Sequence, residues 1–148
     1  MDFFPSLKYM HNINPQYWGS SGWKFMHYIT LAYPDNPTNE DKINIERFFT
    51  SVGNVLPCES CRINYYHHLE EYPLITKALS NRKSLVEWLM NIHNTVNKMH
   101  NKELYTVNKV YEEYMNPNQP LLSANKVLVA LIIIFMILIF FYLRNRSL

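Results

Sequence analysis

Pro57-Cys58-Glu59-Ser60-Cys61 holds the only two cysteines in the 148-residue sequence. Cysteines three positions apart come within disulfide reach on one helical turn or in a tight turn, and the small ring that they close is more reducible than a long structural bridge. An amphipathic run with Ile63, Tyr66 and Leu69 follows the motif. We therefore expect Cys58 at a helix N-terminus, where unpaired N–H groups favour a thiolate, and the motif favours a redox-active dithiol.

Other roles for the two cysteines remain open at this point. A zinc half-site needs a second pair of ligands, and the nearby candidates are His67 and His68, which point about 100° apart on a helix. A structural disulfide is possible, although so short a loop removes little chain entropy. Haem attachment is excluded, because Arg62 stands where a histidine would follow the second cysteine.

The composition narrows the class of protein. Three glycines leave no Gly-rich phosphate loop, and no GxGxxG is present. Lys126, Arg144 and Arg146 belong to the 14 basic residues, so residues 1–120 keep 11 of them beside all 12 acidic residues, a net charge of −1. This near-neutral balance argues against nucleic-acid binding. Eleven Tyr, eight Phe and three Trp can pack a small core or wall a flat cofactor.

The hydrophobic spacing predicts helices and no strand of any length. Asn14-Pro15 is a helix start, and Thr38 with Asp41 resembles a capping box. In chain order, the expected helices are 15–33, 38–55, 58–72, 82–100 and 106–115. The predicted fold class is all-α, a four-helix bundle with a short fifth helix.

The helix expected over 82–100 mixes polar with apolar residues on one side. Leu85, Leu89 and Ile92 face inward, and His93 and Asn97 lie four positions apart beside them. A buried donor without a partner costs about 1–3 kcal/mol. These side chains therefore either have partners or form a surface-exposed edge, and the pattern alone does not decide between the two.

Residues 127–143 are 17 consecutive uncharged, mostly strongly apolar residues. That length is at the short end of membrane-spanning helices, and Lys126 and Arg144 flank the run. We expect a single-pass transmembrane helix over 126–144. The start of the chain lacks the basic and apolar regions of a signal peptide, so we expect the folded domain to stay on the cytosolic side.

Taken together, three blocks of the sequence resemble the Erv/ALR family of FAD-linked sulfhydryl oxidases. The middle block is the proline followed by CxxC, and the last is Trp88 with His93-Asn94-Thr95-Val96-Asn97, similar to the family's W-x4-HN-x-VN motif. The first block comprises Trp18-Gly19, Trp23, His27 and Tyr33-Pro34. The order and spacing also match. The resemblance places an Erv/ALR-like domain at 14–115, after an irregular lead at 1–13. A linker at 116–125, the transmembrane helix and a short tail at 145–148 follow the domain.

The resemblance implies an enzyme that binds FAD beside the CxxC and passes two electrons from a dithiol to O2, giving H2O2. Cys61 would be the flavin-proximal cysteine, and Cys58 would exchange disulfides with substrate. This fits the expectation that Cys61 lies toward the core and Cys58 at the exposed end. The implied cofactor-binding residues are Gly19, Trp23, His27, Tyr33, Met90, His93, Asn94, Val96, Asn97, Lys102, Tyr105 and Tyr114; no metal ligand is implied.

Departures from the family bear on the expected partners. Ser20 stands where the family usually has a basic residue, Met90 stands where some members have a structural cysteine, and no second CxxC is present. The electron donor would be a protein dithiol substrate or a separate thioredoxin-like shuttle protein. The short, anchored form resembles versions from large cytoplasmic DNA viruses, which implies host cytoplasmic or virion membranes, and the family implies a homodimer.

One alternative function belongs to a different class. The chain could be a membrane-anchored zinc-binding or thiol-based interaction module without flavin. Such a module would keep its partner binding after Cys61→Ser, whereas an oxidase needs both cysteines. A flavoprotein fold kept only as a scaffold is disfavoured by the intact pair.

Overall fold

The computed structural model describes residues 11–74, 76–115 and 124–146, and these residues form helices and no strand. This confirms the all-α prediction. Contacts divide the chain into two units, residues 1–116 and 117–148. The elements in order are α1 (Pro15–Ala32), α2 (Asn39–Val55), α3 (Glu59–Glu71), the 3-10 turn η1 (Ala78–Ser80), α4 (Arg82–Met99), α5 (Val107–Met115) and α6 (Ala124–Arg146).

Side-chain caps start the helices where the sequence indicated. The Asn14 side chain accepts the Gln16 N–H at the start of α1, and Pro15 is the first helical residue. At α2, Thr38 Oγ1 accepts the Asp41 N–H while the Asp41 carboxylate accepts the Thr38 N–H, which confirms the predicted capping box.

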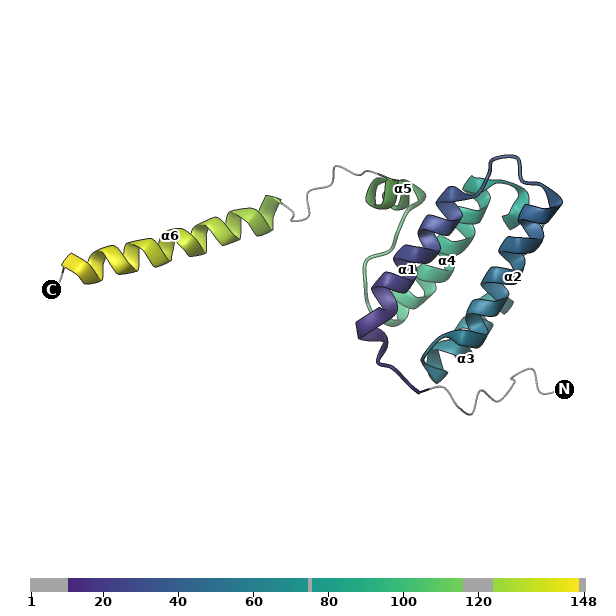
Figure 1. The fold of residues 1–148 in the computed structure, drawn as a ribbon, viewed down its shortest axis with the longest axis horizontal. Coiled ribbons are helices and arrows are strands. Elements are labelled where there is room, and N and C mark those ends of the chain that lie inside the picture. Colours follow the sequence, from purple (N-terminus) through teal and green to yellow (C-terminus); the bar gives the residue numbers. More distant parts are fainter. Residues whose placement is uncertain (1–10, 75, 116–123, 147–148) are drawn as a thin grey trace. The chain divides into compact units, whose positions relative to one another are not determined.

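Four helices pack into the bundle of the first unit, with α1 along α4 and α2 against α3 (Figure 1). The centre is apolar: Phe49 of α2 and Leu85, Leu89 and Ile92 of α4 are fully buried. Trp88 Nε1 donates to the Tyr72 carbonyl at 2.8 Å, so the largest core ring also has its polar atom paired. This core fixes the relative positions of the helices that carry the candidate functional site.

Gly53 of α2 lies against Tyr65 and Tyr66 of α3. A Cβ added there would lie 2.9 Å from Cδ1 of Tyr65 and 3.1 Å from Cζ of Tyr66. Both rings are held in place, because Tyr65 Oη donates to the Phe49 carbonyl and Tyr66 Oη donates to the Asn54 side chain. The absence of a side chain at this position therefore sets the spacing of the two helices.

Helix α3 buries only part of the expected apolar face, since Leu69 packs against the core and Tyr66 is half-buried. The run of Ile63, Tyr66 and Leu69 was the expected apolar face, but Ile63 is 41% exposed, and the buried residues of α3 are Tyr65 and His68. The expectation was wrong for Ile63, because the most buried face carries polar side chains, which weaken its apolar signal.

Helix α6 belongs to the second unit and is apolar along most of its length. Its window Leu128–Asn145 has a mean hydropathy of 2.5, and none of the side chains described in it is buried. In length and composition this helix could cross a membrane.

Candidate functional site

Cys58 and Cys61 form a disulfide at the start of α3, with their Cα atoms 5.1 Å apart. Cys58 is the N-cap residue, and its Sγ accepts the Cys61 N–H at 3.2 Å. The predicted position of Cys58 at a helix N-terminus is confirmed. Once the disulfide is reduced, the helix end favours a thiolate at this sulfur.

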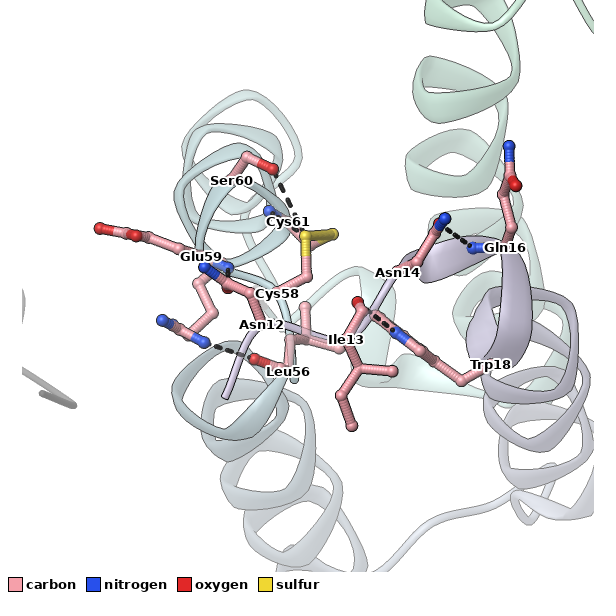
Figure 2. Close-up of a disulfide and its surroundings, with 11 residues drawn as sticks. Asn12, Ile13, Asn14, Gln16, Trp18, Leu56, Cys58, Glu59, Ser60 and Cys61 are labelled. Atoms are coloured by element: carbon pink, nitrogen blue, oxygen red, sulfur yellow. Dashed lines mark hydrogen bonds between the residues drawn. A yellow bond between two sulfur atoms is a disulfide. The ribbon is translucent and has the colours of Figure 1, made fainter. Parts of the chain in front are cut away.

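The segment before α1 runs beside Cys58 and pairs with the residues on either side of it (Figure 2). The Ile13 N–H donates to the Pro57 carbonyl at 2.7 Å, and the Asn12 side chain accepts the Glu59 N–H at 2.8 Å. Cys58 is only 7% exposed as a result. The expectation of an exposed Cys58 was therefore wrong, because main-chain pairing with a segment more than 40 positions away covers it.

Each cysteine faces its own cavity. Cys58 lines the more open one, together with Asn12, Ile13 and Ser60. Cys61 lines the other, which encloses about 720 Å³ including the solvent at its mouth. The residues around the Cys61 cavity come from the helices α1, α2, α3 and α4 and from the C-caps of α2 and α4. They are Pro15, Trp18, Gly19, Trp23, Met26, Val52, Leu56, Cys61, Asn64, Tyr65, His68, Val96, Met99 and His100.

Two polar groups in the wall of the Cys61 cavity already have protein partners. Trp18 Nε1 donates to the Ile13 carbonyl at 3.2 Å, and Tyr65 Oη donates to the Phe49 carbonyl at 2.9 Å. In contrast, the buried Nε2 of His68 has no partner among the described residues. The cavity thus combines flat apolar walls, a redox-active sulfur and an unpaired ring nitrogen.

Aromatic side chains of α1 and α4 continue from the cavity into the bundle. The Trp23 ring stacks on His93 with centroids 4.1 Å apart, and His93 Nδ1 lies 3.0 Å from His27 Nε2. Burial lowers the pKa of His27 to about 4. Burial, followed by the charges of His27 and Lys102, lowers the pKa of His93 to about 3. Both imidazoles are therefore neutral at neutral pH, and one donates to the other.

Two tyrosines stack on this pair of histidines. His27, His93, Tyr105 and Tyr114 together are called the aromatic cluster. Tyr114 of α5 stacks on His27 with centroids 4.8 Å apart, and Tyr105 stacks on His93 at 5.0 Å. The Asn94 side chain holds the main chain of Tyr105 by accepting its N–H and donating to its carbonyl. His93 and Asn94 of α4 thus have partners within the protein, and neither they nor the buried Asn97 form a surface-exposed edge.

The structure brings some of the predicted cofactor residues together and leaves others apart. Gly19, Trp23 and Val96 line the Cys61 cavity, and the cluster joins it through Trp23. Tyr33 lies at the other end of α1, where its hydroxyl donates to the Leu79 carbonyl. Met90 packs with Leu31, Val86 and Val110. Asn97 is buried, and its carbonyl accepts the N–H of Lys102, which is exposed.

Several residues of the cavity were not predicted to contact the cofactor. On α3 they are Asn64, Tyr65 and His68, which share one face with Cys61 at helical spacing. That spacing, counted from Cys61 rather than from the apolar residues, is the signal that could have found them. No group of three or more His, Cys, Asp or Glu that could hold a metal is found in the described part of the chain.

Comparison with known proteins identifies the family. The Erv1/Alr family profile matches residues 20–115. The chain belongs to the Erv1/Alr family. Among Erv1/Alr relatives, a probable FAD-linked sulfhydryl oxidase of Acanthamoeba polyphaga mimivirus is 47% identical over 100 residues, which cover 68% of this chain and 70% of the relative.

Other Erv1/Alr relatives agree with this assignment. The FAD-linked sulfhydryl oxidase ERV2 of Saccharomyces cerevisiae is 30% identical over 96 residues, which cover 65% of this chain but only 47% of ERV2. The chain thus spans about half of the yeast relative. The crystal structure of the yeast Erv1 core superposes with a TM-score of 0.65 at 21% identity, covering 80% of this chain and 98% of that one. This likeness shows the Erv1-like fold.

The residues present fit the FAD that these relatives are named for. Gly19 lines the cavity, yet a Cβ added to it would meet no atom within 4 Å, so no protein neighbour requires a glycine there. Two buried ring nitrogens, His27 Nδ1 and His68 Nε2, lack partners in the described part of the chain. A flat heterocyclic ligand with hydrogen-bonding edges would use both features.

Proposed function

We propose that this chain is an FAD-linked sulfhydryl oxidase, which forms disulfides in protein substrates through Cys58 and Cys61. The observation that carries the proposal is the position of the pair between two cavities, with Cys61 in the wall of one and Cys58 in the wall of the other. A dithiol in this position can exchange with a substrate on one side and give up electrons on the other.

Cys58 is the cysteine that exchanges with the substrate. A substrate thiolate attacks Cys58 Sγ, the Cys58–Cys61 bond breaks, and Cys61 leaves as a thiolate. The second substrate thiol then attacks the mixed disulfide, and Cys58 leaves as a thiolate favoured by the N-terminus of α3. The substrate ends as a disulfide, and the enzyme pair ends reduced by two electrons.

Cys61 and the cavity wall serve the cofactor. FAD bound there would supply the acceptor for the two electrons, and O2 would then take up these electrons with two protons as H2O2. Gly19, Trp23 and Val96 would hold the flavin ring beside Cys61, while the cluster of His27, His93, Tyr105 and Tyr114 would hold the adenine end. This division is supported by the position of Gly19, Trp23 and Val96 in the same cavity wall as Cys61 and by the unpaired Nδ1 of His27 within the cluster.

We also infer where the enzyme works and with which partners. The exposed apolar surface of α6 supports a single-pass membrane anchor, with the catalytic unit of residues 14–115 on the cytosolic side. Exposed Tyr17, Phe25 and Tyr28 on α1 support a homodimer that pairs through this helix. Electrons come from a protein dithiol or from a separate thioredoxin-like shuttle, and the viral relatives support a viral source.

A visible absorption spectrum of the full chain in mild detergent tests the proposal. We expect a flavin spectrum that bleaches when a dithiol is added without oxygen and that returns with air and H2O2. Cys61→Ser should abolish the bleaching. Cys58→Ser should block turnover of protein dithiols while leaving a slow reaction of Cys61 with small thiols.

Two results would contradict the proposal. A colourless protein with stoichiometric zinc would make the cysteines metal ligands in an interaction module. Normal flavin reduction in Cys61→Ser would remove this residue from the cofactor side.

A further inference from the structure

His68 lies on the same face of α3 as Cys61, seven residues further along the helix. Seven residues make about two turns, so the two side chains point in nearly the same direction. Both line the same cavity. His68 is only 7% exposed, and its buried Nε2 has no hydrogen-bond partner in the described part of the chain.

An unpaired buried ring nitrogen is costly in a folded protein. A buried polar atom without a partner costs about 1–3 kcal/mol, so such atoms usually pair with protein, water or a ligand. Trp18 Nε1 and Tyr65 Oη line the same cavity, but their hydrogens already go to the Ile13 and Phe49 carbonyls, and no hydrogen bond joins either group to His68 Nε2. The ring that carries this unpaired nitrogen belongs to a residue that lines the cavity.

The imidazole of His68 is suited to a neutral hydrogen bond. Burial lowers its pKa; the Glu71 carboxylate opposes this shift, and His67 adds to it. The ring can therefore donate one N–H without bringing a full charge into an apolar cavity.

We propose that His68 is a flavin-contacting residue, whose Nε2–H donates a hydrogen bond to an acceptor on the edge of the isoalloxazine ring. This inference rests on the proposed function. Two-electron reduction makes the acceptor atoms of a flavin more negative, so a donated hydrogen bond strengthens in the reduced state. His68 thereby favours transfer of electrons from the cysteine pair to the cofactor.

The midpoint potential of the bound flavin tests this role independently of turnover. In His68→Leu, which offers no donor, we expect the two-electron reduction equilibrium to fall about tenfold, or about 30 mV. His68→Gln keeps a donor of similar reach and should stay within about threefold of the wild type. The matched control is His67→Leu, because His67 is the neighbouring histidine and its side chain is 66% exposed; its potential should not change.

The outcomes separate this inference from the proposed function. Equal potentials in the wild type and His68→Leu, with flavin bound in both, would overturn the hydrogen bond. An equal fall in the Leu and Gln variants would also overturn it, since packing alone would then explain the change. A wild-type protein that binds no flavin would overturn the proposed function itself.

A measurement on the wild type covers the case in which the variants do not fold. In ¹⁵N-labelled holoenzyme, the Nε2 resonance of His68 should move between the oxidised and reduced flavin states, while the resonances of His67 stay in place. A His68 resonance that does not move would contradict the contact.

Discussion

At the scale of single residues, the site depends on side chains that are absent as much as on those that are present. Gly19 and Gly22 lie one turn apart on α1. A Cβ at Gly22 would make an ordinary contact of 3.4 Å with the Trp18 ring, whereas a Cβ at Gly19 would meet no protein atom within 4 Å. Of these two glycines, only Gly19 lines the Cys61 cavity. A side chain added at Gly19 would therefore affect the cofactor, whereas one added at Gly22 would affect only packing within the helix.

Gly19→Ala should weaken FAD binding without unfolding the protein. We expect the dissociation constant for FAD to rise about tenfold, since one added methyl group in a filled site costs on the order of 1–3 kcal/mol. Titration of FAD by fluorescence quenching measures this. The control Gly22→Ala should bind FAD like the wild type, and equal affinities in all three proteins would remove Gly19 from the cofactor site.

At the scale of helices, the distance between α2 and α3 positions Cys61 against the opposite wall of its cavity. Gly53→Ala should push these helices apart, because Tyr65 and Tyr66 are both pinned by hydrogen bonds. Overpacking costs about 1–3 kcal/mol, and the better helix propensity of alanine returns at most about 1 kcal/mol. Urea unfolding should therefore show a net loss of stability, and an unchanged midpoint would mean that the rings can yield.

The helices themselves could be predicted from the sequence to within about two residues, because caps and apolar spacing are local signals. The buried face of α3 could not be predicted in full. Its inward side carries Asn64 and His68, since it borders a cavity rather than the apolar core. The pairing of Asn12 with Glu59 was equally hidden, because two hydrogen bonds between distant segments leave no periodic pattern.

At the scale of the whole molecule, the bundle and the apolar helix α6 are separate units. All core clusters of the described residues lie in the first unit. Deletion of residues 121–148 should therefore give a protein that stays folded, binds FAD and remains in solution without detergent. Gel filtration and the flavin spectrum check this, and loss of FAD from the shortened chain would show that the second unit supports the site.

The segment beside Cys58 competes with substrates for the main-chain groups next to this cysteine. Ile13 occupies the Pro57 carbonyl and Asn12 occupies the Glu59 N–H beside Cys58, and their attachment to α1 gives them a high effective concentration. An incoming polypeptide that pairs with these two main-chain groups has to displace Asn12 and Ile13 first. Exchange with a large partner would then level off at the rate at which this segment detaches, however much partner is supplied.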